Sequence, residues 1–177
     1  MAQTQKVSTC LWFDTEAEDA VNFYVSIFED SHVVRMSRYG KDQRMPAGTV
    51  LTVEFDLAGT RFMALNGGPL FKFTEASSMV VKCDTQAEID RVWEALLADG
   101  GCEVQCGWLK DKYGLSWQIV PVELGDMMQD PDGEKTARVM AALLQMVKLD
   151  VAKLTAAFKG EPDSTPERVP ARAEGQR

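Results

Sequence analysis

A short helix-start signal occurs twice in this sequence, 70 positions apart, and each copy follows an apolar run. The copies read Asp14-Thr15-Glu16-Ala17-Glu18 and Asp84-Thr85-Gln86-Ala87-Glu88. Thr-x-x-Glu is a capping box, in which the Thr hydroxyl and the Glu carboxylate each accept a hydrogen bond from a free amide at the start of a helix. Apolar residues at helical spacing follow both copies, so each predicts a strand and then a helix. Two such signals in the same context indicate a duplicated β-α unit.

A second repeated signal is a turn between two strand-like runs, at Asp56–Gly59 and again at Asp111–Gly114. Asp in the first position and Gly in the last are typical of a hairpin loop. The two turns are 55 positions apart, so the second repeat lacks about 15 residues between its helix and its hairpin. We therefore predict β-α-β-β-β followed by β-α-β-β, with one strand lost or shortened in the second repeat. If the second loop closes evenly, Trp108 and Trp117 should lie opposite each other.

Length, charge and hydropathy limit the possible functions. A chain of 177 residues can form one domain with a substantial core. The net charge of −8, without a basic stripe, argues against nucleic acid and anionic membranes as partners. No apolar run approaches the ~20 residues that span a bilayer. Met1–Lys6 lacks the apolar segment of a secretory signal, so we expect a cytoplasmic protein.

The four cysteines and the single histidine are the candidate metal ligands and disulfide partners. Cys10 and Cys83 lie in strand-like apolar runs, where free cysteine behaves as a small hydrophobic residue. Cys102 and Cys106 have no second ligand pair, and His32 is the only histidine. A cytosolic location also disfavours disulfides. We therefore predict structural thiols, with no metal site and no cofactor.

Two segments lie outside the repeats. Asn66-Gly67-Gly68-Pro69 interrupts the chain before Phe71 and Phe73, which predicts either a turn with a core plug or a ligand-facing loop. Residues 123–159 have helical spacing and an apolar stripe that needs a surface to cover. This stripe either covers the protein's own sheet or forms the interface of a homodimer. Residues 161–177 contain prolines and no aromatic residue, which predicts a disordered tail.

Several motifs, together with the order of predicted elements, resemble the vicinal oxygen chelate superfamily, which includes glyoxalase I and the fosfomycin- and bleomycin-resistance proteins. The resemblance is closest to the PhnB-like branch, often labelled 3-demethylubiquinone-9 3-methyltransferase. It covers about residues 5–160, and the segments that carry it are Cys10–Asp14, Phe23-Tyr24, Phe62–Pro69, Gln105–Gly114, Ser116–Pro121, Arg138–Met140 and Leu149-Asp150.

The resemblance implies a single α+β glyoxalase-like domain over residues 1–160. Two β-α-β-β-(β) modules, at about 7–66 and 77–121, would form a curved mixed sheet around a cavity. C-terminal helices at 123–159 would follow. The methyltransferase label is not expected to describe the activity, because neither Gly67-Gly68 nor Gly100-Gly101 has the strand-to-helix context of a Rossmann cofactor loop.

The resemblance also implies where a metal would be bound in the metal-dependent members. The first-strand ligand falls at Val7 or Thr9, its equivalent in the second repeat at Ser77 or Met79, and the hairpin ligand at Gln118. A divalent site needs three or four good donors, and only Gln118 is a credible one. The cavity is therefore predicted without its metal.

Period-two alternation places a mostly apolar set of residues with a few polar anchors on the sheet face away from the helices. Such a face suits a small organic molecule. Gln118 is the strongest candidate, because its amide can both donate and accept, although it could equally satisfy a neighbouring backbone or hydroxyl group. A non-catalytic dimeric protein and a metal-dependent enzyme are the alternatives, and catalysis itself is left open. The predicted cavity residues are Thr9, Leu11, Asn66, Ser77, Met79, Ser116 and Gln118.

Overall fold

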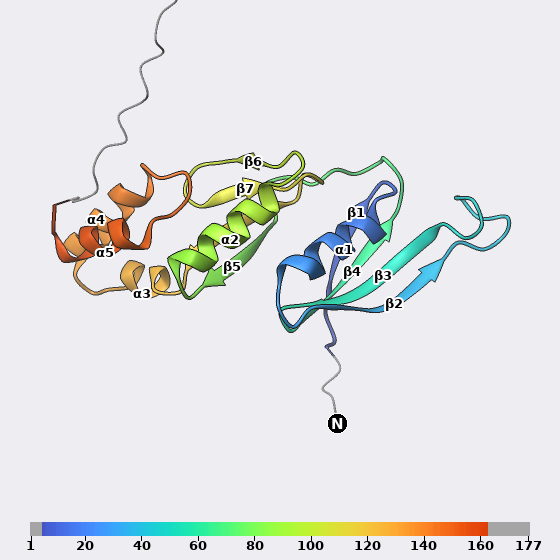
Figure 1. The fold of residues 1–177 in the computed structure, drawn as a ribbon, viewed down its shortest axis with the longest axis horizontal. Coiled ribbons are helices and arrows are strands. Elements are labelled where there is room, and N and C mark those ends of the chain that lie inside the picture. The colour runs from blue at the N-terminus through green and yellow to red at the C-terminus, as the bar shows by residue number, and fades with distance from the viewer. Residues whose placement is uncertain (1–4, 163–177) are drawn as a thin grey trace, which may run out of the picture.

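A computed structural model describes residues 5–162, which form two sheet-and-helix modules and a group of C-terminal helices arranged in a row (Figure 1). Module 1 contains β1 (Thr9–Phe13), α1 (Ala17–Ile27), β2 (His32–Arg38), β3 (Val50–Leu57) and β4 (Thr60–Asn66). Module 2 contains β5 (Ser78–Cys83), α2 (Gln86–Leu97), β6 (Cys102–Glu103), β7 (Trp108–Lys110) and β8 (Ser116–Pro121). The C-terminal helices are α3 (Leu124–Met128), α4 (Gly133–Leu143) and α5 (Val151–Lys159).

The strand order confirms the duplication. It is β1-β4-β3-β2 in the first sheet and β5-β8-β7-β6 in the second, so each sheet has the same topology. In both modules the first strand is parallel to the last, and the other neighbours are antiparallel. The shortened strand is β6, which has 2 residues where β2 has 7. The α+β class is confirmed, with two separate four-stranded sheets that do not close on each other within residues 5–162.

Only one of the two predicted capping boxes forms. At the start of α2, the Thr85 hydroxyl accepts from the Glu88 amide at 3.2 Å, and the Glu88 carboxylate accepts from the Asp84 amide at 2.8 Å. At the start of α1 the carboxylate of Glu16 accepts from the Thr15 amide at 2.9 Å, and the Glu16 side chain caps none of the helix amides. The Ala17 amide instead donates to the side-chain oxygen of Asn66 on β4, at 2.8 Å. Helix α1 is therefore capped from the sheet that it covers.

A shared core joins the two modules. Each helix packs an apolar stripe onto one face of its own sheet, and the two stripes belong to one continuous cluster. Between the modules, the ring of Phe28 stacks on Trp117 with centroids 5.6 Å apart. The guanidinium of Arg91 on α2 donates to the carbonyl of Ile27 at the end of α1, at 2.8 Å.

Asp111 is the polar centre of this junction, with only 3% of its surface exposed. One carboxylate oxygen accepts from the Tyr24 hydroxyl of module 1 and from the Trp117 indole, each at 2.8 Å. The other accepts from the backbone amides of Tyr113 and Leu115 at 2.9 and 3.1 Å. Burial raises the pKa of Asp111, while these donors act in the opposite direction. Burial and the nearby Asp111 charge raise the pKa of Tyr24.

The linker between the modules is held by Trp12. The indole of Trp12 donates to the carbonyl of Gly68 at 2.8 Å and lies against Gly67, where a Cβ would come within 2.2 Å of the ring. Phe73 packs edge-on against Phe13 of the core, which supports the core-plug interpretation for this ring. Phe71 contacts Trp12 and stays exposed.

The C-terminal helices form a smaller cluster of their own, built on Val139, Met146, Leu149 and Leu154. They join module 2 through backbone bonds from Cys106 and Gly107 to the carbonyls of Met146 and Val147, at 2.8 and 2.7 Å. The predicted stripe therefore covers its own helices for the most part, leaving three exposed apolar residues: Met140, Leu144 and Val147.

The predicted tail at 161–177 lies outside the described residues from position 163 onward. Within residues 5–162, none of the helices has the length and hydrophobicity needed to cross a lipid bilayer.

Candidate functional site

Each sheet has one face covered by its helix and one open face, and alternation along the strands decides which side chains reach the open face. On β8, Trp117 and Ile119 are buried in the core, so Ser116 and Gln118 point to the open face as predicted. On β1 the phase is opposite to the prediction. Leu11 is 5% exposed and belongs to the core, and Thr9 shares its face.

The second-repeat residues are also corrected. Met79 packs against the core on the helix side, and Ser77 precedes β5, so the open-face serine is Ser78. Apolar residues occupy both faces of β1 and β5, because Cys10 to Phe13 and Met79 to Val81 are continuous apolar runs. Alternation cannot choose a phase in such runs, and only the packing of the helices does so.

Asn66 was predicted to face the cavity, and the structure uses its amide in the fold. The side-chain oxygen caps α1, and the side-chain nitrogen donates to the carbonyl of Val50 at 3.0 Å. The residue is 1% exposed. Both ends of the amide are therefore engaged within module 1.

The open face of module 2 carries a continuous set of polar side chains, which we call the polar strip: Ser78, Trp108, Lys110, Ser116 and Gln118. Ser116 lies between Ser78 on one neighbouring strand and Lys110 on the other. Gln118 lies opposite Trp108 on the open face. Trp117 lies opposite Leu109, and both of these residues face the core. The predicted Trp108–Trp117 pair is therefore wrong by one position, which in a strand changes the face.

Several hydrogen-bonding groups of the polar strip have no partner among residues 5–162. The Ser116 hydroxyl is buried, at 1% exposure, and makes no hydrogen bond. The Gln118 amide nitrogen donates to the Ser78 hydroxyl at 2.9 Å, which leaves the amide oxygen available as an acceptor. Native proteins rarely leave a buried hydroxyl unsatisfied, so Ser116 calls for an explanation.

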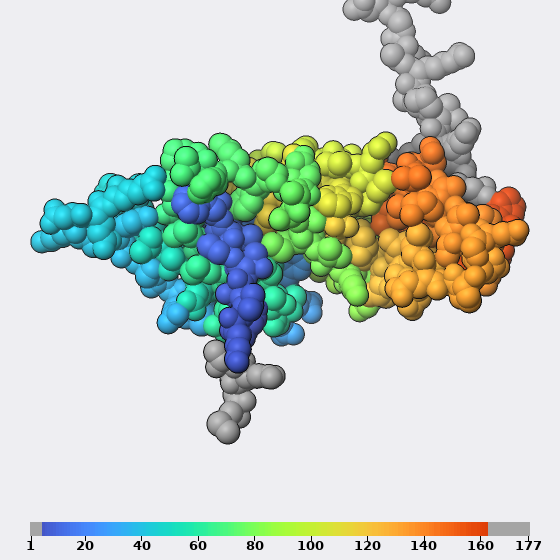
Figure 2. All heavy atoms as spheres, turned by 180° about the vertical axis from the view of Figure 1, so that it is seen from behind, coloured from blue at the N-terminus to red at the C-terminus, as the bar shows by residue number. Residues whose placement is uncertain are grey.

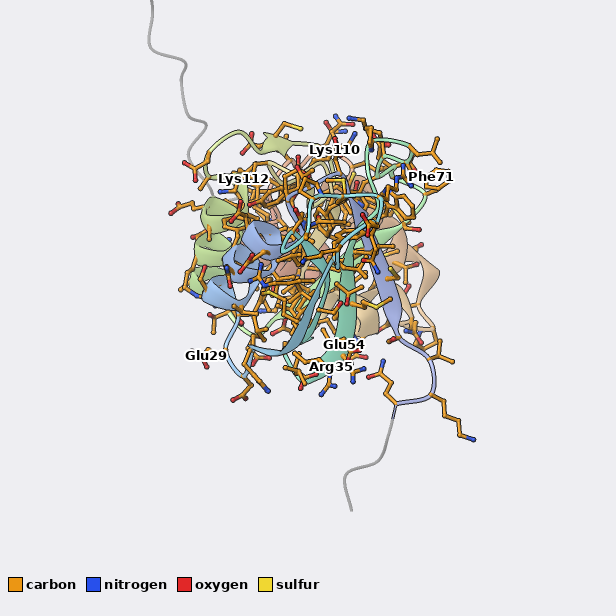
Figure 3. All side chains as sticks on the ribbon, turned by 90° about the vertical axis from the view of Figure 1, so that its right-hand side faces the viewer. Glu29, Arg35, Glu54, Phe71, Lys110 and Lys112 are labelled. Carbon is orange, nitrogen blue, oxygen red and sulfur yellow. The ribbon has the colours of Figure 1, made fainter. Side chains whose placement is uncertain are left out.

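Lys110 forms an ion pair with Glu75 of the linker. The hydrogen bond to Glu75 raises the pKa of Lys110, and the same bond lowers the pKa of Glu75. The Lys110 side chain is 31% exposed and that of Glu75 is 60% exposed. In Figure 3, Lys110 lies at one end of the view, and Arg35 and Glu54 lie together at the other.

The open face of module 1 differs, because its charges neutralise one another. Arg35 pairs with Glu54, and Arg61 pairs with Asp56 and reaches Glu54 at 4.0 Å. His32 lies 3.7 Å from Asp56. The hydrogen bonds from the arginines lower the pKa values of both carboxyl groups. The feature that distinguishes the open face of module 2 is the buried hydroxyl of Ser116, which has no hydrogen-bond partner among residues 5–162.

The residues do not fit the metal implied by the superfamily. No group of three His, Cys, Asp or Glu side chains gathers within residues 5–162. Val7 is 83% exposed and has no donor atom for a metal in its side chain. The amide nitrogen of Gln118 donates a hydrogen bond to the Ser78 hydroxyl. All four cysteines are free thiols, and burial raises the pKa of Cys83 to about 12. Cys10, predicted to be packed, is exposed on the free edge of β1.

Comparison with known proteins decides the family. The family described as 3-demethylubiquinone-9 3-methyltransferase matches residues 5–120. The chain belongs to this family. A PhnB protein from Bacillus cereus is 39% identical, with a TM-score of 0.62, and the match covers 67% of this chain and 100% of that one. The predicted PhnB-like resemblance is thereby confirmed. The family match spans both modules and ends before α3, short of the residue 160 predicted from the motifs.

Two further solved structures are similar to this chain at lower sequence identity. Protein PA1353 from Pseudomonas aeruginosa is 19% identical with a TM-score of 0.55, over 67% of this chain and 98% of that one, and shares the fold. The fosfomycin resistance protein FosX from Mesorhizobium loti is 14% identical with a TM-score of 0.47, over 67% and 91%. The comparison with curated proteins gave no match.

Proposed function

We propose that this PhnB-family protein binds a small organic molecule on the polar strip of module 2. The observation that carries the proposal is the buried, unpartnered hydroxyl of Ser116 beside the free amide oxygen of Gln118. An unsatisfied buried hydroxyl costs about 1–3 kcal/mol, and a bound ligand would supply its partner. Binding is proposed before catalysis, because no general base hydrogen-bonds Ser116 within residues 5–162.

Neither metal chemistry nor methyl transfer enters the proposal. The residues at the superfamily's ligand positions lack the donors for a divalent ion. The family's printed description names a methyltransferase, and this chain has no glycine-rich loop between a parallel strand and a helix to hold such a cofactor. We expect a cytoplasmic protein that binds neither nucleic acid nor membranes, in line with its net charge of −8.

We also propose a homodimer. Two features support it. The residues Met140, Leu144 and Val147 are exposed, and the outer edges of β1 and β5 pair with no other strand among residues 5–162. Figure 2 shows the N-terminal strand lying at the surface. Free strand edges and exposed apolar patches are features that natural proteins usually cover. A dimeric protein without catalytic activity is the second candidate function.

Substitutions on the polar strip test the binding proposal. A fragment screen by protein-observed NMR would first identify a molecule that shifts the resonances of Trp108 and Gln118. Gln118→Leu should then weaken its binding by about 1–3 kcal/mol, because a buried partner is left unpaired. Ser116→Ala should weaken binding without lowering the melting temperature, since the hydroxyl makes no bond in the free protein.

Ser37→Ala is the matched control, because Ser37 also carries a hydroxyl on an open face, paired there with Thr52 at 2.6 Å. It should leave binding unchanged. Unchanged affinity in Gln118→Leu together with a markedly lower melting temperature would show that Gln118 serves the fold alone. That result would refute the proposed site.

A further inference from the structure

The ion pair between Glu75 and Lys110 crosses the polar strip at Ser116. Ser78, Ser116 and Lys110 are neighbours on β5, β8 and β7, in that spatial order. Glu75 lies on the linker just before β5 and reaches Lys110 on the far side of β8. The pair therefore spans the strand that carries Ser116, a residue that is 1% exposed although its side chain points to the open face.

The polar strip combines several hydrogen-bond donors with one positive charge, and its own residues carry no negative charge. The Ser116 hydroxyl has no acceptor within residues 5–162, and the Trp108 indole adds an N–H donor beside Gln118. The Ser78 hydroxyl accepts from Gln118 and keeps its own proton available. Lys110 adds a positive charge. The oxygens of Ser78, Ser116 and Gln118 can also accept hydrogen bonds. The strip carries one cationic group, Lys110, and no acidic side chain of its own.

Glu75 is weakly held in this position. It comes from a part of the linker without regular secondary structure, and its side chain is 60% exposed. Its carboxylate is held by Lys110 and by a backbone amide of Glu75 itself, so Lys110 is its one side-chain partner in the ion pairs of residues 5–162. An exposed ion pair of this kind contributes little to stability, so another carboxylate could replace that of Glu75 at little cost.

Building on the proposed binding function, we propose that the polar strip takes a small molecule bearing a carboxylate, and that Glu75 occupies the place of that carboxylate in the free protein. The ligand's carboxylate would accept from Lys110 and from the Ser116 hydroxyl, while Glu75 swings out with the linker. Charge-assisted bonds of this type are the stronger ones in proteins. Glu75 thus competes with the ligand and sets the affinity of the site.

The experiment compares benzoate with benzamide, which has the same shape and no charge, by NMR titration of the full chain. The readout is the ratio of the two affinities. A substitution that merely makes the site more accessible would raise both affinities alike and leave this ratio unchanged. Glu75→Gln should raise the benzoate-to-benzamide ratio by about threefold to fivefold, because Lys110 loses its internal partner. Lys110→Met should lower the ratio by about tenfold or more.

Asp99→Asn is the matched control, because it breaks an exposed ion pair of the same kind, 3.2 Å long, with Lys112 in the adjoining turn. It should leave the ratio unchanged. Phenylphosphonate distinguishes carboxylates from other oxyanions, and tighter Lys110-dependent binding of phenylphosphonate than of benzoate would overturn the inference.

The outcomes separate the two proposals. If neither benzoate nor benzamide shifts the polar-strip resonances of Glu75→Gln, and the fragment screen is also negative there, the binding function itself fails. If benzamide binds as well as benzoate in all variants, or if Glu75→Gln leaves the ratio unchanged, binding stands and the carboxylate inference is overturned.

Discussion

At the scale of single residues, Asp111 shows how a buried charge can hold two modules together. Its carboxylate has no cationic partner among residues 5–162 and relies on four donors, two of which are the Tyr24 hydroxyl and the Trp117 indole. A buried carboxylate is tolerated only when its lone pairs are satisfied in this way. The Tyr24 bond is the one that reaches across from module 1, so Asp111 both opens the turn that ends at Gly114 and joins the modules.

Replacing Asp111 by Asn should therefore destabilise the protein by about 1–3 kcal/mol, because an amide nitrogen cannot accept from the Trp117 indole. Urea unfolding measures the change. Tyr24→Phe, which removes one donor and leaves the other three, should cost less, about 0.5–1.5 kcal/mol. A larger loss in Tyr24→Phe than in Asp111→Asn would contradict this role for the carboxylate.

The pH dependence of the Asp111 variant has a definite sign. The pKa of Asp111 in the folded protein lies above its ordinary value of 3.8, so the folded state holds this proton more tightly than the unfolded state. The contribution of Asp111 to stability is thus present in full below the unfolded pKa of 3.8 and is lost as the pH rises through the folded pKa. The gap in unfolding free energy between wild type and Asp111→Asn should be wider at pH 4 than at pH 7. A gap that narrows toward pH 4 would mean that the donors outweigh burial.

At the scale of elements, contacts between residues far apart in the chain fix the start of α1 and the path of the linker, which local sequence does not determine. The linker after β4 packs against the indole of Trp12. The ring fits there because Gly67 has no side chain. Helix α1 begins where Asn66 of β4 caps it, whereas α2 is capped by its own Thr85. Asn66 at the end of β4 and its neighbour Gly67 thus position both the linker and the start of α1 in module 1. The equivalent residue at the end of β8 is Pro121, which has no side-chain amide to cap a helix.

Gly67→Ala should destabilise the protein by about 1–3 kcal/mol, because the new methyl group would collide with the Trp12 ring. Thermal unfolding measures the loss. Trp12→Phe in the same chain should recover part of it, since the smaller ring leaves room, and the double-mutant cycle gives the coupling. Gly133→Ala is the control, because nothing lies within 4 Å of its Cβ position. A coupling near zero would show that the two residues act independently.

The two helix caps should differ in their cost of removal. Thr85→Ala should lose about 1 kcal/mol, as is usual for a solvent-accessible cap. Asn66→Ala should lose about 2–4 kcal/mol, because it strands both the Ala17 amide and the Val50 carbonyl in a buried site. Chemical denaturation of the two variants compares them directly. Equal losses would show that water replaces the Asn66 amide.

At the scale of the whole molecule, the modules and the C-terminal helices form a row (Figure 1). The C-terminal helices at one end of this row are among the segments that carry exposed apolar side chains. Helices α3 to α5 lie beyond the family match, and their side chains Met140 and Leu144 are 40% and 53% exposed. Covering these apolar side chains with a second protein surface would remove them from water, which favours association.

Sedimentation at micromolar concentration should therefore give a dimer. Leu144→Glu should shift the equilibrium toward monomer, because the interface would have to bury an unpaired charge. Leu70→Glu, at a linker residue that is 67% exposed, is the comparison. A monomer in wild type would refute the homodimer. A monomer in Leu70→Glu but not in Leu144→Glu would place the interface at the linker.

Local signals in the sequence were sufficient for the duplicated topology. The helix starts at Thr15 and Thr85 and the turns at Asp56 and Asp111 predicted the repeat and the shortened strand, because each depends on neighbours in the chain. They also placed Ser116 and Gln118 on the open face, where β8 alternates after a turn of known position.

Only the tertiary structure decided the rest of the site. The faces of Leu11 and Met79 depend on which side the helices pack, since both strands are apolar on both sides. The cap of Asn66 joins residues 49 positions apart, and the Glu75–Lys110 pair crosses a strand that comes later in the chain than both. Contacts of this kind follow from how strands are ordered in a sheet, and no local pattern encodes that order.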